Sequence, residues 1–154
     1  MNKINRKFEY ALIALKHMRA KAPGELTTAK EVCESYGSPF DATARALQTL
    51  AQRGVLKSEQ GAHGGYAISR DLSRVSVYEL MEMILGPMGL AKCLNVDEST
   101  DGENACEIRL RCNIVSSMAS LNRRLAEFYR GLSVSEILGA GRRIRSVEAE
   151  GVSV

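Results

Sequence analysis

The sequence predicts a mainly helical protein with one small β-hairpin, and three patterns support this fold class. Side chains that cap helices precede several amphipathic segments. A glycine-rich stretch over residues 60–65 separates two short runs with strand character. Further along the chain, apolar residues from Ile114 to Leu132 repeat with spacings of four and three, which predicts one long helix with an apolar seam.

The first predicted helix rests on four apolar residues at helical spacing, namely Ile4, Phe8, Leu12 and Leu15. The helix is expected to run over residues 4–18. Pro23 and Gly24 follow it and predict a turn, because proline and glycine interrupt helical hydrogen bonding.

Two shorter helices with a glycine between them are predicted next. Residues 28–31 match the capping box, in which a hydroxyl and a carboxylate satisfy free backbone N–H groups, and predict a short helix up to Tyr36. Gly37 supplies the turn. Residues 38–41 then place Ser at the N-cap, Pro at the first helical position and an acid in the first turn, which predicts a helix over residues 39–53. Two helices joined in this way form a helix-turn-helix unit.

A β-hairpin is predicted directly after the third helix, which Gly54 closes. Residues 55–59 and 66–69 are short strand-like runs on either side of the glycine-rich loop. A hairpin in this position is the wing of a winged helix-turn-helix. With a further capped helix that begins at Ser76, this domain is expected to span residues 1–86.

The apolar seam of the long helix predicts that a second surface covers it. The seam consists of Ile114, Met118, Leu121, Leu125, Phe128 and Leu132. Since the other helices cover one another, we expect a second copy of the chain to pack there in a homodimer, with packing inside one chain as the alternative. Residues 113–138 are then a dimerisation helix and a short capped C-terminal helix, and residues 139–154 are a flexible tail.

Charge is distributed unevenly along the chain. Residues 1–75 contain 12 Lys and Arg against 7 Asp and Glu, whereas residues 76–154 contain 9 against 11. The N-terminal half is therefore expected to meet a polyanion. No apolar run reaches the length of a membrane span and no signal-peptide pattern is present, so we expect a cytoplasmic protein without a membrane partner.

Three segments occur in a distinctive order: residues 6–15, the wing residues 64–66, and Gly86-Pro87 followed by Cys93. Together they resemble the Rrf2 family of bacterial transcription regulators, over about residues 1–138. The resemblance implies a winged helix-turn-helix that binds double-stranded operator DNA and a long dimerisation helix. It also implies a loop over residues 87–112 that binds an iron–sulfur cluster as a sensor of nitric oxide, redox stress or iron status. On this basis we expect a repressor.

The third helix is the predicted recognition helix, because such a helix places its N-terminal residues in the major groove. The expected base-reading residues are Ser38, Phe40, Asp41, Thr43, Arg45 and Gln48. The expected core residues on this helix are Ala44, Leu47 and Leu50. The residues expected at phosphates are Lys3, Arg6, Lys7 and Thr28, and those expected at the minor groove are Lys57, His63, Gly64 and Gly65. Alternatively, Asp41 only caps its helix and His63 is only an exposed turn residue.

Three of the four cysteines, Cys93, Cys106 and Cys112, are predicted metal ligands. They lie within twenty residues in an irregular, acidic stretch, where thiolates can converge on iron without breaking a helix. In a reducing compartment such thiols are more often ligands or redox groups than disulfides. Cys33 is instead expected in the core, in the middle of the second helix.

Clusters typically have four ligands, so one ligand is missing from the three cysteines. The resemblance implies either a His just after the third cysteine, where this chain has Val115, or an acidic residue on the first helix of the partner subunit, which Glu9 matches. Other possible ligands are Asn113, Glu107 and His17. The cysteine spacing leaves both a 4Fe-4S and a 2Fe-2S cluster open.

Two further functions are alternatives. On the same DNA-binding fold, the cysteines could bind zinc or form a thiol-redox switch. In another class of protein, the chain would be an iron–sulfur electron carrier or enzyme. The sequence disfavours the second class, because it contains no Walker or Rossmann glycine pattern and no nucleophile elbow, and we expect no enzymatic activity.

Overall fold

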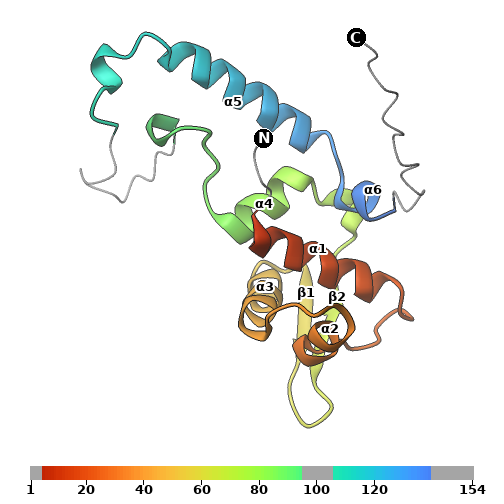
Figure 1. Cartoon of the computed structure of the whole chain (residues 1–154). Coiled ribbons are helices and arrows are strands. Elements are labelled where there is room, and N and C mark those ends of the chain that lie inside the picture. The colour runs from red at the N-terminus through yellow and green to blue at the C-terminus, as the bar shows by residue number, and fades with distance from the viewer. Residues whose placement is uncertain (1–4, 95–105, 140–154) are drawn as a thin grey trace, which may run out of the picture.

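The computed structural model describes residues 5–94 and 106–139, and it has the predicted mainly helical fold with one hairpin (Figure 1). Its elements in chain order are α1 (Arg6–Arg19), α2 (Ala29–Tyr36), α3 (Phe40–Gln52), β1 (Leu56–Glu59), β2 (Gly65–Ile68), η1 (Leu72–Arg74), α4 (Val77–Leu85), η2 (Lys92–Leu94), η3 (Arg109–Arg111), α5 (Val115–Arg130) and α6 (Val134–Gly139). Residues 95–105 of the predicted cluster-binding loop and nearly all of the predicted tail lie outside the described residues.

The predicted capping residues begin their helices, but one capping box is only half formed. The hydroxyl of Thr28 accepts a hydrogen bond from the backbone N–H of Glu31 at 3.2 Å and starts α2. The Glu31 carboxylate does not return to the helix start, because it pairs with Lys21. At the start of α6 both halves form, since Ser133 and Glu136 bond reciprocally through backbone N–H groups and side chains.

The start of α3 differs from the prediction. Pro39 has extended backbone angles and occupies the N-cap position, so the helix begins at Phe40 and the prediction of Ser38 as the cap was wrong. The Ser38 hydroxyl accepts a hydrogen bond from the Thr43 hydroxyl at 2.9 Å and donates one to Sγ of Cys33 at 3.6 Å. Ser38 therefore connects α2 to α3 across the turn instead of capping the helix.

The hydrophobic core lies between α1, α3 and α4. Its largest fully buried side chains include Leu15 of α1, Leu47 and Leu50 of α3, and Leu80 of α4. Each such leucine contributes about 1.5–3 kcal/mol through burial. The prediction that Leu47 and Leu50 face the core is confirmed, and their burial fixes which side of α3 is left for solvent.

The hairpin pairs β1 with β2 in an antiparallel register from Leu56 opposite Ile68 to Glu59 opposite Gly65. Residue Thr27, just before α2, extends this sheet, because its N–H and C=O exchange hydrogen bonds of 2.8 Å with Tyr66. The hairpin is thereby attached to the helix-turn-helix, and its loop extends beyond α2 (Figure 1).

The long helix α5 is attached to the rest of the chain at its C-terminal end. The backbone N–H of Val77 donates to the carbonyl of Leu132, and that of Val134 donates to the carbonyl of Val75, both at 2.8 Å. From this attachment α5 packs across α4 and then extends away from α1–α4 (Figure 1). None of the described helices is long and apolar enough to cross a membrane.

Candidate nucleic-acid interface

The exposed side of α3 carries a stripe of polar residues. Asp41, Arg45 and Gln48 are spaced by four and three residues, so they share one face of the helix, and all three side chains are exposed. Phe40, the first residue of the helix, is exposed as well. The structure therefore places four of the six predicted base-reading residues where a ligand can reach them.

Thr43 and Ser38 do not belong to this exposed face. Thr43 is fully buried, and its hydroxyl is engaged with Ser38. The prediction of Thr43 as a base-reading residue is wrong for this structure, because its side chain faces the interior beside Leu47. Ser38 is half-buried and hydrogen-bonded on both sides, which makes it a structural link in the turn.

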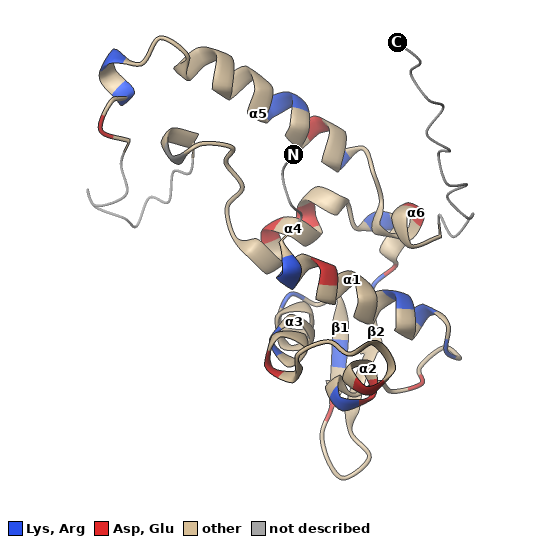
Figure 2. Cartoon of the chain, viewed as in Figure 1, with Lys and Arg blue, Asp and Glu red and all other residues tan. Residues whose placement is uncertain are grey.

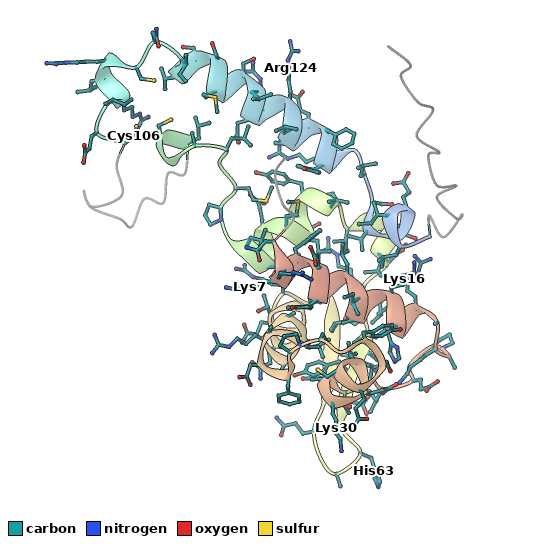
Figure 3. All side chains as sticks on the ribbon, viewed as in Figure 1. Lys7, Lys16, Lys30, His63, Cys106 and Arg124 are labelled. Atoms are coloured by element: carbon teal, nitrogen blue, oxygen red, sulfur yellow. The ribbon has the colours of Figure 1, made fainter. Side chains whose placement is uncertain are left out.

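A hollow joins the start of α1 to α3. Lys7 and Arg45 both line this cavity of about 370 Å³, together with Asp41, Ala42, Ala46, Thr49 and Ile84. Figure 3 shows Lys7 at the start of α1. Two cations from separate helices and one carboxylate thus line this surface depression, and the excess of positive charge suits an anionic group such as a phosphate.

The other two basic residues predicted near phosphates are placed less favourably. Arg6 is exposed, but its guanidinium lies 3.3 Å from the Glu9 carboxylate, which partly neutralises it. Lys3 lies outside the described residues. Lys7 is therefore the predicted N-terminal cation that the structure brings together with α3, the predicted recognition helix.

The wing presents its predicted residues in two ways. His63 lies at the tip of the hairpin loop, clear of the helices (Figure 3), whereas Lys57 on β1 is 3.4 Å from the Glu59 carboxylate. Gly64 and Gly65 are required by the fold itself: a Cβ on Gly64 would lie 2.3 Å from the Glu59 carbonyl oxygen, and one on Gly65 would lie 2.9 Å from that of Thr27. Their presence is explained without any contact to DNA.

The N-terminus of α2 contains one predicted and one unpredicted candidate. Thr28 is exposed, and its hydroxyl already serves as the cap of α2. Lys30, which the sequence analysis missed, is exposed in the same first turn with Glu34 3.8 Å away (Figure 3). Its position two residues after a capping threonine was the available signal, because basic groups near a helix start can meet the anion that the start attracts.

A cluster of polar side chains holds α1 against α2. The Glu31 carboxylate contacts Nζ of Lys21 at 2.5 Å and Nε2 of His17 at 2.8 Å. Burial raises the pKa of Glu31, but the hydrogen bonds from Lys21 and His17 and their positive charge outweigh burial, so the pKa is lowered. Glu31 is therefore held as a carboxylate that fixes the orientation of the helix-turn-helix on α1.

Basic residues are distributed over several helices and the hairpin within residues 5–94. Lys and Arg lie at both ends of α1 and on α2, α3 and β1, with Asp and Glu interspersed (Figure 2). Among these residues, Lys7 and Arg45 line one hollow.

The predicted metal ligands lie at the N-terminal end of α5, far from the hairpin. Cys93 belongs to η2, Cys112 ends η3, and Cys106 precedes η3 (Figure 3). All three are half-exposed free thiols. Among the described residues, no three His, Cys, Asp or Glu side chains converge into a metal-binding group. The three thiols lie on irregular chain at one end of one helix, and thiolates are ligands that iron binds well. The structure does not bring the three sulfur atoms together.

The proposed fourth ligand, Glu9, lies on α1. The helix α1 and the cysteine-bearing segments are well separated within one chain (Figure 1). The Glu9 carboxylate is half-exposed and its nearest cation is Arg6. Cys33, expected in the core, is only half-buried on α2 and accepts the hydrogen bond from Ser38, and it lies apart from the other cysteines.

The seam of α5 is divided into two lines in the monomer. Met118, Leu125 and Leu132 are half-buried, whereas Ile114, Leu121 and Phe128 are 54%, 48% and 61% exposed. Packing within one chain therefore covers one line of the heptad and leaves every member of the other line open to solvent.

Comparisons with known proteins agree with this arrangement. A family model described as Rrf2, iron-dependent transcriptional regulator, matches residues 4–140. A Rhodobacter capsulatus protein named as an rrf2-like HTH-type transcriptional regulator is 34% identical over 116 residues, which cover 69% of this chain and 76% of that protein. The HTH-type transcriptional regulator NsrR of Bacillus subtilis is 23% identical over 106 residues and 69% of each chain.

The fold is also found among solved structures. CymR, the global cysteine regulator of Bacillus subtilis, superposes with a TM-score of 0.64 at 16% identity and covers 90% of this chain and 98% of that chain. The family match, the exposed stripe on α3 and the wing lead to one conclusion. The chain belongs to the Rrf2 family, and it is a winged-helix DNA-binding transcription regulator and not an enzyme.

Proposed function

We propose that the protein is a homodimeric repressor that reads its operator through α3 and that responds to an iron–sulfur cluster. The observation that carries the DNA-reading part is the exposed stripe of Asp41, Arg45 and Gln48 next to a hollow that Lys7 shares. In this arrangement Arg45 and Gln48 donate hydrogen bonds to base edges in the major groove, and Lys7 neutralises a neighbouring phosphate.

Two variants separate these roles on duplex DNA that the wild-type protein selects from a random library. Arg45→Ala is expected to lose about 5- to 150-fold in affinity for the selected duplex and to lose its preference for it. Lys7→Ala is expected to weaken binding to selected and unselected duplexes alike, and to reduce the salt dependence by about one phosphate contact.

The matched control is Arg74→Ala, which removes an exposed positive charge on η1, away from α3. This variant is expected to bind like the wild type. If Arg45→Ala keeps full affinity and preference in the same assay, the assignment of α3 as the recognition helix is wrong.

The homodimer is supported by the exposed line of the α5 seam. Three large apolar side chains at heptad spacing, Ile114 at the N-cap of α5 and Leu121 and Phe128 on the helix, are what a second copy of the same helix covers. Two copies also match DNA binding, because a dimer presents two recognition helices to two half-sites.

The cluster is supported by the donor set and by the family, whose model is described as iron-dependent. Cys93, Cys106 and Cys112 are the proposed thiolate ligands, and Glu9 of the partner subunit is the proposed fourth. Glu9 within the same chain is a poor candidate, because α1 lies away from the cysteine segments (Figure 1). A cluster held in this way would make the protein sensitive to nitric oxide, oxidants or iron supply.

A further inference from the structure

Two large aromatic side chains are exposed beside the turn of the helix-turn-helix. Tyr36 at the end of α2 is 53% exposed and Phe40 at the start of α3 is 56% exposed. Among described residues, the other exposed large hydrophobic side chains all lie on residues 108–128. Within residues 5–94, exposed aromatic surface is thus concentrated at the place where the recognition helix begins.

The two aromatic side chains have different surroundings. The Tyr36 hydroxyl lies 3.0 Å from Nδ1 of His17, and its ring stands edge-on to the imidazole, so contacts inside the protein account for its position. Phe40 has no polar atom and is not packed against the hydrophobic core. Its exposed ring is apolar surface that a ligand can cover, and burial of that surface would be favourable.

The neighbours of Phe40 indicate which ligand covers it. The next exposed residues on α3 are Asp41, Arg45 and Gln48, which are polar or charged, and Lys7 lines a hollow together with Asp41 and Arg45. A lipid or an apolar protein surface does not suit such a border, whereas duplex DNA does. The major groove offers one apolar group at base edges, the 5-methyl group of thymine.

We propose that Phe40 is a specificity-determining residue that packs its ring against the 5-methyl group of a thymine in each half-site. This inference rests on the proposed reading of DNA by α3. It predicts that each half-site of the operator contains a thymine that is recognised through its methyl group and not through a hydrogen bond.

The test compares thymine with deoxyuridine, which lacks only the 5-methyl group. A duplex selected by the wild-type protein is synthesised with each thymine in turn replaced by deoxyuridine, symmetrically in both half-sites. The wild type is expected to lose about fourfold in affinity per half-site at one position, since burial of a methyl group contributes about that much. Phe40→Ala is expected to bind the thymine and deoxyuridine duplexes equally.

Two control variants test the role of the ring. Phe40→Leu keeps an apolar side chain and is expected to retain part of the preference for thymine. Tyr36→Phe keeps the other exposed ring and removes only its hydroxyl, and it is expected to retain the whole preference.

The possible failures are distinguishable. If the wild type selects a defined duplex but binds all the deoxyuridine duplexes equally, or if Phe40→Ala keeps the difference, the role of Phe40 is wrong and DNA reading by α3 stands. If the wild type selects no sequence at all, the proposed reading of DNA fails, and the role of Phe40 fails with it.

Discussion

Nε2 of His17 lies 2.8 Å from Oε1 of Glu31, while Nδ1 of the same ring lies 3.0 Å from the hydroxyl of Tyr36. One imidazole on α1 thus contacts both the first and the last turn of α2. Lys21 completes the group from the other side of Glu31. Since α2 is joined to α3 through the turn, this cluster links α1 to the orientation of α3, the proposed recognition helix.

The Glu31 contacts predict an acid-sensitive contribution to stability. The lowered pKa of Glu31 means that its contribution is fully present above the ordinary value of 4.5 and is lost as the pH falls through the lower folded-state value. Glu31→Gln is expected to lower the free energy of unfolding at pH 7 by about 1 kcal/mol or less, because the carboxylate is partly exposed. Urea denaturation at pH 7 and below pH 4.5 measures both effects.

The control for this prediction is Glu34→Gln on the same helix, which removes an exposed carboxylate 3.8 Å from Lys30. Glu34→Gln is expected to change stability little at either pH. If the free energy of unfolding changes between the two pH values by the same amount in Glu31→Gln as in the wild type, Glu31 carries no acid-sensitive stabilisation.

The wing is expected to depend on glycine at position 64. In Gly64→Ala the new Cβ meets the backbone oxygen of Glu59 at 2.3 Å, so the hairpin must shift, at a cost of about 1–3 kcal/mol. Gly131→Ala is the matched control, because its Cβ meets only ordinary contacts at 3.5 Å. The midpoint temperature of thermal unfolding and the affinity for DNA are expected to decrease for Gly64→Ala only. If the two variants have the same midpoint and the same affinity, the close contact between a Cβ at position 64 and the Glu59 oxygen is contradicted.

The exposed line on α5 predicts the oligomeric state. Leu121→Glu places a charge in the middle of the proposed dimer seam and is expected to give a monomer in sedimentation at micromolar concentration. Ala119→Glu adds the same charge to an exposed position outside the seam and is expected to leave a dimer. A monomeric wild type, or a dimeric Leu121→Glu protein, would exclude this seam as the dimer contact.

The cysteines predict iron and sulfide in protein purified without oxygen. Single alanine replacements of Cys93, Cys106 and Cys112 are expected to lower iron and sulfide content and visible absorbance, with Cys33→Ala as the control that keeps both. Glu9→Ala is expected to alter the spectrum as well. A wild type that contains zinc without sulfide would favour the structural zinc alternative, and a metal-free wild type would favour the thiol switch.

Much of the fold was predictable because it depends on local chemistry. Thr28 and Ser133 begin helices where their hydroxyls accept backbone N–H groups, and Gly37 turns the chain with a positive φ of 68°. The alternation of Leu47 and Leu50 with polar neighbours also predicted which face of α3 is buried, since helical periodicity depends only on position in the sequence.

Predictions failed where a side chain had two possible partners. Ser38 and Glu31 are both typical of helix starts, yet Ser38 bonds Thr43 and Cys33, and Glu31 bonds Lys21 and His17. The competing groups come from other elements or from across a turn, so the choice between them is made by packing and not by local sequence.

The sequence by itself determined the helices, the hairpin, the seam on α5 and the family resemblance, because capping, periodicity and glycine turns act over a few residues. Only the tertiary structure decided that Thr43 is buried while Phe40 is exposed, that Lys7 joins Arg45 at one hollow, and that half of the seam on α5 stays open. These features depend on how α1, α3, α4 and α5 pack, and packing is set by contacts between residues that are far apart in the chain.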